Sequence, residues 1–176
     1  MPQLLDKGFV ERAGQLLARN ALPPDTLELE LTETAFQTGA ATIEALQRAR
    51  ELGLPIALDD FGTGYSSLNS LSRLPLKRVK LDRSLIADCD TNMRSAAIAR
   101  AIISVCHSLG LEVTVEGIER IEQLRLLARC GPIAAQGHLV SYPIAGEAIP
   151  AFVQGSRARL ASLLAHPGRE ADREAV

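Results

Sequence analysis

The stretch PIALDDFGTGYSSL, from Pro55 to Leu68, joins a short apolar run to a glycine-containing turn through two adjacent aspartates. A short apolar run that is bounded by turn residues is typical of a buried strand. The stretch therefore predicts a buried strand that ends at Asp59, with Asp60 and a flexible turn directly after it.

Similar strands alternate with amphipathic helices on both sides of this stretch. Strands are expected around 27–31, 55–59, 78–82, 111–117 and, more weakly, 133–139, and helices around 9–20, 43–53, 98–110, 121–131 and 149–164. The expected apolar faces of the first three helices are Phe9, Val10, Ala13, Leu16 and Leu17, then Ile43, Leu46, Ala49 and Leu52, then Ile98, Ile102, Val105 and Leu109. This alternation predicts parallel β-α units and fits either a doubly wound sheet or a (β/α)8 barrel.

The composition limits the class of protein. The 176 residues are 47% hydrophobic, enough for the core of one domain, and the net charge of −2 gives no electrostatic basis for binding nucleic acid. The isolated cysteines Cys89, Cys106 and Cys130 predict buried thiols in a reducing compartment. Because no apolar run reaches the ~18 residues of a membrane span, a cytoplasmic protein without a membrane segment is expected.

Polar residues stand where each expected strand ends, namely Glu30, Asp59 and Asp60, Lys80 and Asp82, Glu116, and Gln136. Ligands of parallel α/β folds bind at the carboxyl ends of the strands, so these side chains should converge. Neighbouring carboxylates repel unless a cation lies among them, and an all-oxygen ligand set favours Mg²⁺ or Mn²⁺ over Zn²⁺. Adjacent aspartates can bridge two such ions for in-line attack on phosphate, and Lys80 could orient the water or the phosphate.

Each of these features also has a simpler interpretation. Two aspartates before a glycine turn are typical of a solvated turn or a helix cap. His107 lies on a helix, far from any strand end, and is expected to pack there rather than to bind metal. The segment RLPLKR, residues 73–78, is either a patch that steers phosphate or an ordinary solvated face.

Five segments resemble, in order and spacing, the EAL domain family: LELELTET, IALDDFGTGYSSL, LPLKRVKLDRSLI, VTVEGIERIEQLRLL and QGHLVSYPI. The resemblance covers roughly Gln3 to Ala151. It implies a modified (β/α)8 barrel that uses two Mg²⁺ or Mn²⁺ ions to hydrolyse the bacterial second messenger cyclic di-GMP to linear pGpG. The expected domain spans residues 1–155, and residues 156–176 are expected to form the end of a helix and a disordered tail.

The resemblance also implies roles for individual residues. Glu30 and Asp59 resemble ligands of the first metal, with Asp59 bridging to a second metal that Asp60 completes. Lys80 resembles the lysine that holds the catalytic water, and Glu116 the carboxylate that activates this water or binds it to metal. The remaining expected site residues are Glu119, Gln136 and Asp82 in the substrate pocket, and Glu33, which would anchor the loop 61–67 near a dimer contact.

The chain departs from the family pattern in ways that affect this expectation. The Glu-Ala-Leu strand and the Asn-x-Ser strand are absent, and each gives the family a ligand of the first metal. The chain is therefore expected to form a partial barrel with little hydrolytic activity of its own, completed by a homodimer or by an upstream barrel fragment. The alternative is a catalytically inactive module that binds cyclic di-GMP or another protein. His138, Arg120 and Tyr142 replace an aromatic residue, threonine and arginine of the family.

Overall fold

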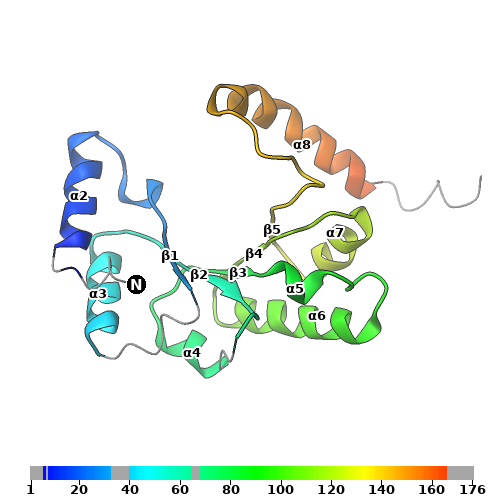
Figure 1. Ribbon diagram of the computed structural model, residues 1–176, viewed down its shortest axis with the longest axis horizontal. Helices are drawn as coiled ribbons and strands as arrows, with labels where there is room; N and C mark the ends of the chain where they lie inside the picture. Colours follow the sequence, from blue (N-terminus) through cyan, green and yellow to red (C-terminus); the bar gives the residue numbers. More distant parts are fainter. Residues whose placement is uncertain (1–5, 7, 33–39, 65–67, 166–176) are drawn as a thin grey trace, which may run out of the picture.

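One parallel β-sheet organises the protein in the computed structural model, which describes residues 6, 8–32, 40–64 and 68–165 (Figure 1). Its strands are β1 (Leu29–Thr32), β2 (Ile56–Phe61), β3 (Arg78–Leu81), β4 (Glu112–Val115) and β5 (Ala134–Ala135). They lie in the order β1-β2-β3-β4-β5, and every neighbouring pair is parallel. All five strands were predicted from the sequence.

The strand order decides between the two folds that the alternation left open. A doubly wound sheet reverses its strand order at a switch point, whereas the strands of a (β/α)8 barrel follow one another around the sheet. Here each strand pairs with the next strand along the chain and no order is reversed. The described sheet is therefore an arc of a TIM-like barrel, which confirms the predicted partial barrel.

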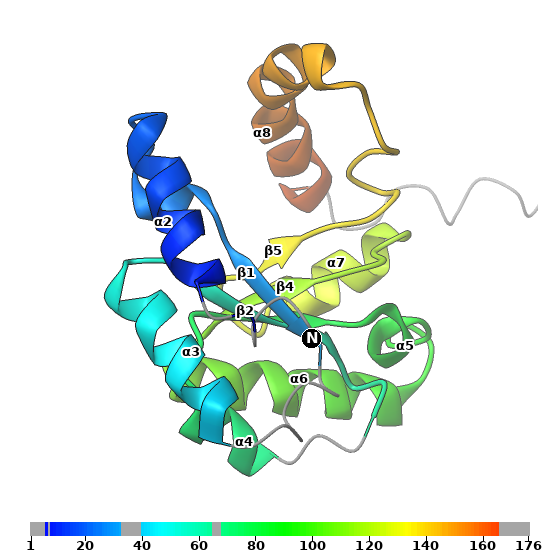
Figure 2. The ribbon, with the colours of Figure 1, turned by 60° about the vertical axis from the view of Figure 1, so that its left-hand side comes forward.

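Helices precede, connect and follow the strands. They are α2 (Phe9–Arg19), α3 (Ala40–Glu51), α4 (Leu68–Arg73), α5 (Arg83–Ile86), α6 (Met93–Ser108), α7 (Ile121–Ala128) and α8 (Ile149–Ala165), with 3₁₀ turns η1 (Pro24–Thr26) and η3 (Gly146–Ala148). Figure 2 shows α3, α4 and α6 on the same side of the strands. None of the described helices is long and apolar enough to cross a membrane.

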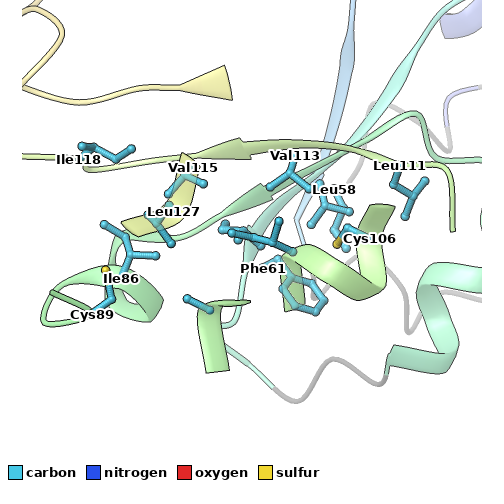
Figure 3. Packing of buried hydrophobic residues seen from close by; sticks show 14 of the residues in the cluster. Leu58, Phe61, Ile86, Cys89, Cys106, Leu111, Val113, Val115, Ile118 and Leu127 are labelled. Atoms are coloured by element: carbon cyan, nitrogen blue, oxygen red, sulfur yellow. The ribbon is translucent and has the colours of Figure 1, made fainter. Parts of the chain in front are cut away.

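The core lies between the sheet and these helices. Strand residues Leu58, Val79, Leu81, Val113 and Val115 pack against Ala99, Ile103 and Cys106 of α6 (Figure 3). A second cluster joins α2 and α3 to β1 and β2 through residues that include Val10, Leu31, Leu46 and Ile56. Because side chains alternate along a strand, the residues between these core positions point to the opposite face of the sheet.

The helix faces that enter the core largely match the prediction for α2, where Val10, Ala13 and Leu17 are buried, but differ from it in part for α3 and fully for α6. In α3 the buried residues are Thr42, Ala45, Leu46 and Ala49, and in α6 they are Ala96, Ala99, Ile103 and Cys106. Leu16, Ile43, Leu52, Ile98 and Leu109 were predicted to be buried and are exposed. The prediction followed the largest apolar residues, whereas small side chains let a helix approach a sheet closely and therefore occupy the contact face.

Candidate metal centre

Four predicted site residues share the face of the sheet opposite α6. Glu30 lies on β1, Asp59 on β2 and Lys80 on β3, and Glu116 directly follows β4. The parallel register places Thr32 beside Asp59 and Lys80 beside Thr114. Glu30 lies two residues before Thr32, and Glu116 lies two residues after Thr114, so all four site residues are near the same end of the sheet. This convergence was predicted from the sequence.

Lys80 lies at the centre of the group. Its Nζ is 2.8 Å from Glu30 Oε1, 2.8 Å from Asp59 Oδ1 and 2.9 Å from Glu116 Oε1. Burial alone would lower the pKa of the Lys80 ammonium, but the carboxylates of Asp59, Glu30 and Glu116 outweigh burial and raise this pKa above its ordinary value. The lysine is therefore a fixed cation at the physiological pH, with only 12% of its side chain exposed.

A β-bulge explains how two adjacent aspartates reach one site. Leu58 pairs with Val79 and Phe61 with Leu81, so Asp59 and Asp60 together lie opposite Lys80 alone. In a regular strand these neighbours would point to opposite faces, but a bulge redirects the side chain at its extra residue. Carboxylate oxygens of Asp59, Asp60 and Glu116 consequently all lie within 4.8 Å of one another.

The backbone of Asp60 is left-handed, with φ of 56°. Aspartate adopts this region more readily than most residues, because its short polar side chain is tolerated there. The turn is held by Thr63, whose backbone N–H and Oγ1 donate to the Asp60 carbonyl at 3.2 and 3.0 Å. The DDFGT sequence therefore encodes both the ligands and the turn that aims them.

The chemistry of these side chains fits a hard divalent cation. All three clustered groups offer carboxylate oxygen, the ligand type that Mg²⁺ and Mn²⁺ prefer. Asp59 Oδ1 is buried, and among the described residues it forms the ion pair with Lys80 but no well-aligned hydrogen bond. A buried carboxylate oxygen without a hydrogen bond is costly, and a metal ion would satisfy it. The residues present therefore fit a hard divalent cation.

A second charged layer lies one step along the same strands. Arg78, two residues before Lys80, pairs with Glu28 at 3.0 Å and with Glu112 at 2.6 Å. Ala57 of β2 lies beside Arg78 in the sheet, and its small side chain leaves room for the long guanidinium to reach across β2 toward Glu28. The hydrogen bond with Glu112 is the main reason that the pKa of Arg78 is raised.

The contacts of this layer show what the basic residues at the end of the segment RLPLKR do. Lys77 lies 3.7 Å from Glu112, and Arg78 is held by two carboxylates near the amino ends of the strands. The charges at 77 and 78 are therefore neither a patch that steers phosphate nor a simply solvated face. Arg78 of β3 links Glu112 of β4 to Glu28, the residue before β1, and Lys77 adds a looser contact with Glu112.

The remaining predicted site residues lie near the same strand ends. Asp82 is the N-cap of α5 and accepts a hydrogen bond from the Ser84 N–H at 2.8 Å. The pKa of Asp82 is lowered, mainly by hydrogen bonding with the Ser84 side chain. Glu119 pairs with Arg83 at 3.2 Å, and Gln136 is exposed directly after β5. Glu33 lies outside the described residues.

One further contact of this region was missed from the sequence. Gln123 is 1% exposed, and its side-chain oxygen accepts from the backbone N–H groups of Glu119 and Arg120 at 3.0 Å. Its amide nitrogen donates to the Ile86 and Ala87 carbonyls at 3.1 Å. Glutamine three residues after a helix start is a capping signal, and it could have indicated this contact.

Arg120 adds a second tie between the same two loops. It donates to both oxygens of Asp90, at 2.7 and 2.6 Å, and to the Ala87 carbonyl at 2.6 Å. The Asp90 side chain is 6% exposed, and Arg120 holds the pKa of Asp90 below its ordinary value. The loop that carries Glu116 and Glu119 is thereby fastened to the segment after α5.

His107 packs on its helix as expected, and two of the three cysteines are buried as predicted, whereas Cys130 is not fully buried. The His107 ring is half-buried on α6, with Nε2 3.0 Å from the Pro132 carbonyl oxygen. Cys89 and Cys106 are buried, Cys130 is half-buried, and all three are free thiols. The single Glu-Ala-Leu tripeptide of the sequence, residues 44–46, lies in the helix α3 and supplies no strand.

Comparison with known proteins identifies relatives for this arrangement. Cyclic di-GMP phosphodiesterase NbdA of Pseudomonas aeruginosa is 42% identical over 150 residues, which are 85% of this chain and 19% of NbdA. The chain thus spans about a fifth of the length of that relative.

Solved structures show the same fold at comparable identity. The EAL domain of Mycobacterium smegmatis DcpA superimposes with a TM-score of 0.81 at 35% identity, and the match covers 88% of this chain and 70% of the chain in that structure. Klebsiella pneumoniae BlrP1, in a complex with manganese and cyclic di-GMP, gives a TM-score of 0.74 at 32% identity, covering 80% of this chain and 36% of BlrP1. The sequence profile described as the EAL domain matches residues 2–143, and the chain belongs to the EAL domain family.

Proposed function

We propose that this chain carries the water-activating part of a phosphodiesterase that hydrolyses cyclic di-GMP to linear pGpG. One observation carries the proposal: Asp59, Asp60 and Glu116 bring their oxygens within 4.8 Å, next to the Lys80 ammonium. Membership of the EAL domain family supports the substrate, because relatives of similar sequence carry this activity in their names.

The ligand set supports two Mg²⁺ or Mn²⁺ ions. Glu30 and Asp59 would hold the first ion, and Asp59 and Asp60 the second, with Asp59 shared between the two. Ions held in this way polarise a phosphoryl oxygen and lower the pKa of bound water to near neutrality.

The chain's own residues would position the reactants. Glu116 would accept a proton from the attacking water, whose oxygen bonds to phosphorus while the bond from phosphorus to the ribose 3′ oxygen breaks. The accepted proton would then pass to the departing 3′ oxygen, which leaves as a hydroxyl. Lys80 is held as a cation by its carboxylate partners, and it donates to the water or to the phosphate, balancing the developing negative charge. Glu119, Gln136 and Asp82 would line the substrate pocket, and Glu33 would anchor the loop 61–67.

Full activity requires ligands that this sequence does not supply. The family takes two more first-metal ligands from its Glu-Ala-Leu and Asn-x-Ser strands. We propose that an upstream barrel fragment or a second copy of the chain completes the site, since β1 and β5 each have one unpaired edge within the described sheet. The three free cysteines support the cytoplasm as the location.

The test compares variants of the complete gene product in the presence of Mn²⁺, with pGpG measured by chromatography. Asp59→Asn and Lys80→Ala should each lose roughly 100-fold or more in turnover, because loss of even an outer partner of a metal ligand costs ~10–100-fold. Lys77→Ala is the matched control, since Lys77 pairs only loosely with Glu112 and lies away from the cluster. Near-normal turnover of Asp59→Asn would refute the proposed site.

A separate measurement addresses the chain alone. We expect it to bind Mn²⁺ through Asp59, Asp60 and Glu116 while producing pGpG far below the ~1–10³ s⁻¹ of ordinary enzymes. Electron paramagnetic resonance reports the bound manganese directly. Mn²⁺ binding that survives in the double variant Asp59→Asn, Asp60→Asn would show that the ion lies elsewhere.

A further inference from the structure

A second charged cavity lies between α6 and α7, and the proposed function does not use it. Its volume is about 410 Å³, and its lining residues are Arg100, Glu122, Arg125, Leu126, Arg129 and Cys130. Arg100 comes from α6, and the other five come from α7 and the two residues that follow it. Three guanidinium groups thus share one cavity with one carboxylate, in a chain whose net charge is −2.

The spacing along α7 makes the cavity one continuous face. Glu122, Arg125, Leu126 and Arg129 follow the helical positions i, i+3, i+4 and i+7, which lie on one side of a helix. Arg125 and Arg129 are therefore neighbours one turn apart, an arrangement in which like charges repel. An anion bound between Arg129 and Arg100 would add a counter-charge to this face.

Two of the three arginines, Arg100 and Arg129, have guanidinium N–H donors that are available to bind a ligand. Across the described part of the chain, the side chains of Arg100 and Arg129 form no ion pair and no hydrogen bond, and both side chains are exposed. Guanidinium groups bind phosphate through two parallel N–H donors, which a point charge such as lysine cannot do. Leu126 and Cys130 give the cavity an apolar part beside these donors.

We infer that this cavity binds a phosphate-bearing small molecule, with the phosphate between Arg100 and Arg129. The site lies apart from the carboxylate cluster. The helix α7 returns from the carboxyl end of β4 to the start of β5, so Arg129 and Cys130 lie toward the amino ends of the strands. A ligand there and a substrate at the metal centre would therefore bind without competing.

Cys130 allows binding to be followed at the cavity itself. Cys89 and Cys106 are buried in the core, whereas Cys130 is half-buried and lines the cavity. Alkylation by iodoacetamide, followed by mass spectrometry, should therefore modify Cys130 first. Saturating pyrophosphate should slow this modification, and calorimetry on the same sample should give the affinity. EDTA is present throughout, so that the metal centre cannot bind the probe through an ion.

Variants distinguish this site from a general attraction to positive charge. Arg100→Gln and Arg129→Gln should each weaken pyrophosphate binding roughly 10-fold, the loss expected for a charge-assisted hydrogen bond. Arg129→Lys should weaken it nearly as much, because the paired donors are lost while the charge remains. Arg94→Gln, on the same helix as Arg100 but outside the cavity, should bind as the wild type does.

The source of the phosphate is distinguished by comparing pyrophosphate with GDP. Tighter binding of GDP would support a nucleotide whose apolar part contacts Leu126, and equal affinity would support inorganic phosphate. The absence of saturable binding by either probe would overturn the inference, as would equal loss in Arg94→Gln. Asp59 takes no part in this cavity, so Asp59→Asn should bind pyrophosphate as the wild type does. This result is independent of whether the proposed phosphodiesterase function is correct.

Discussion

Replacing Lys80 by methionine removes the cation among three carboxylates and keeps most of the side chain's volume. The ammonium contacts Glu30, Asp59 and Glu116 at 2.8, 2.8 and 2.9 Å, and only 12% of the lysine side chain is exposed. In Lys80→Met, Asp59 and Glu116 would remain as neighbouring negative charges in a partly buried site. The folded state should therefore lose free energy relative to the unfolded chain.

Removing one partner of a buried ion pair typically costs ~3–5 kcal/mol. Water solvates the freed Glu30, which is 49% exposed, so we expect the lower end of that range, about 3 kcal/mol at pH 7.5. Lys80 has a raised pKa, so its stabilisation is fully present below the ordinary lysine value and is lost only as pH rises through the raised value. The wild type should thus keep this contribution across the neutral range, whereas the variant should recover stability as acid protonates the freed carboxylates.

The free energy of unfolding is measured by urea denaturation followed by circular dichroism at pH 7.5 and at pH 5. Lys77→Met is the control, because the Lys77 ammonium lies 3.7 Å from Glu112 and is half exposed, so its loss should cost less than about 1 kcal/mol. Addition of Mg²⁺ should restore part of the stability of Lys80→Met, since the ion replaces the lost positive charge. Equal stability of the two lysine variants at pH 7.5 would refute this account of the site.

Three further changes test other parts of the structure. Asp90→Asn should destabilise the chain above pH 5, because the lowered pKa of Asp90 makes its contribution fully present above the ordinary aspartate value of ~3.9. The difference from the wild type should shrink as pH falls through the lowered pKa, and thermal unfolding at a series of pH values measures it. Gly137→Ala should lower the free energy of unfolding by about 3 kcal/mol or more, because the added Cβ would meet a backbone oxygen at 2.2 Å. Gly110→Ala has free space for the added Cβ and should lower it by only about 1 kcal/mol, and urea denaturation measures both. Asp60→Asn should fold like the wild type but bind Mn²⁺ more weakly by calorimetry, because asparagine tolerates the left-handed backbone and lacks the charge; a variant that binds Mn²⁺ normally would exclude Asp60 as a ligand.

The strand ends were predictable because their signal is local and repeated. A short apolar run followed by an acid marks a strand and its carboxyl end, and parallel strands bring such ends together. Glu30, Asp59, Lys80 and Glu116 converge for this reason. The family resemblance then indicated the reaction for these residues, the hydrolysis of a phosphodiester with two metal ions.

Other features depend on the neighbours of each residue and could not be predicted. The buried faces of α3 and α6 are rich in alanine, which the search for large apolar residues passed over. The bulge opposite Lys80 depends on the pairing of β2 with β3, which the apolar pattern does not encode. The ion pairs of Arg78 with Glu28 and Glu112 join residues that are far apart in the sequence, so no local pattern indicates them.

The consecutive strand order has a consequence for synthesis on the ribosome. Each strand pairs with the one made just before it, so the sheet can grow in the direction of translation. The aspartates at 59 and 60 leave the ribosome before Lys80, by roughly 1–4 s at about 5–20 residues per second. During this interval the nascent chain has acids without their counter-charge. We therefore expect cellular Mg²⁺ to associate with the growing sheet before Lys80 leaves the ribosome.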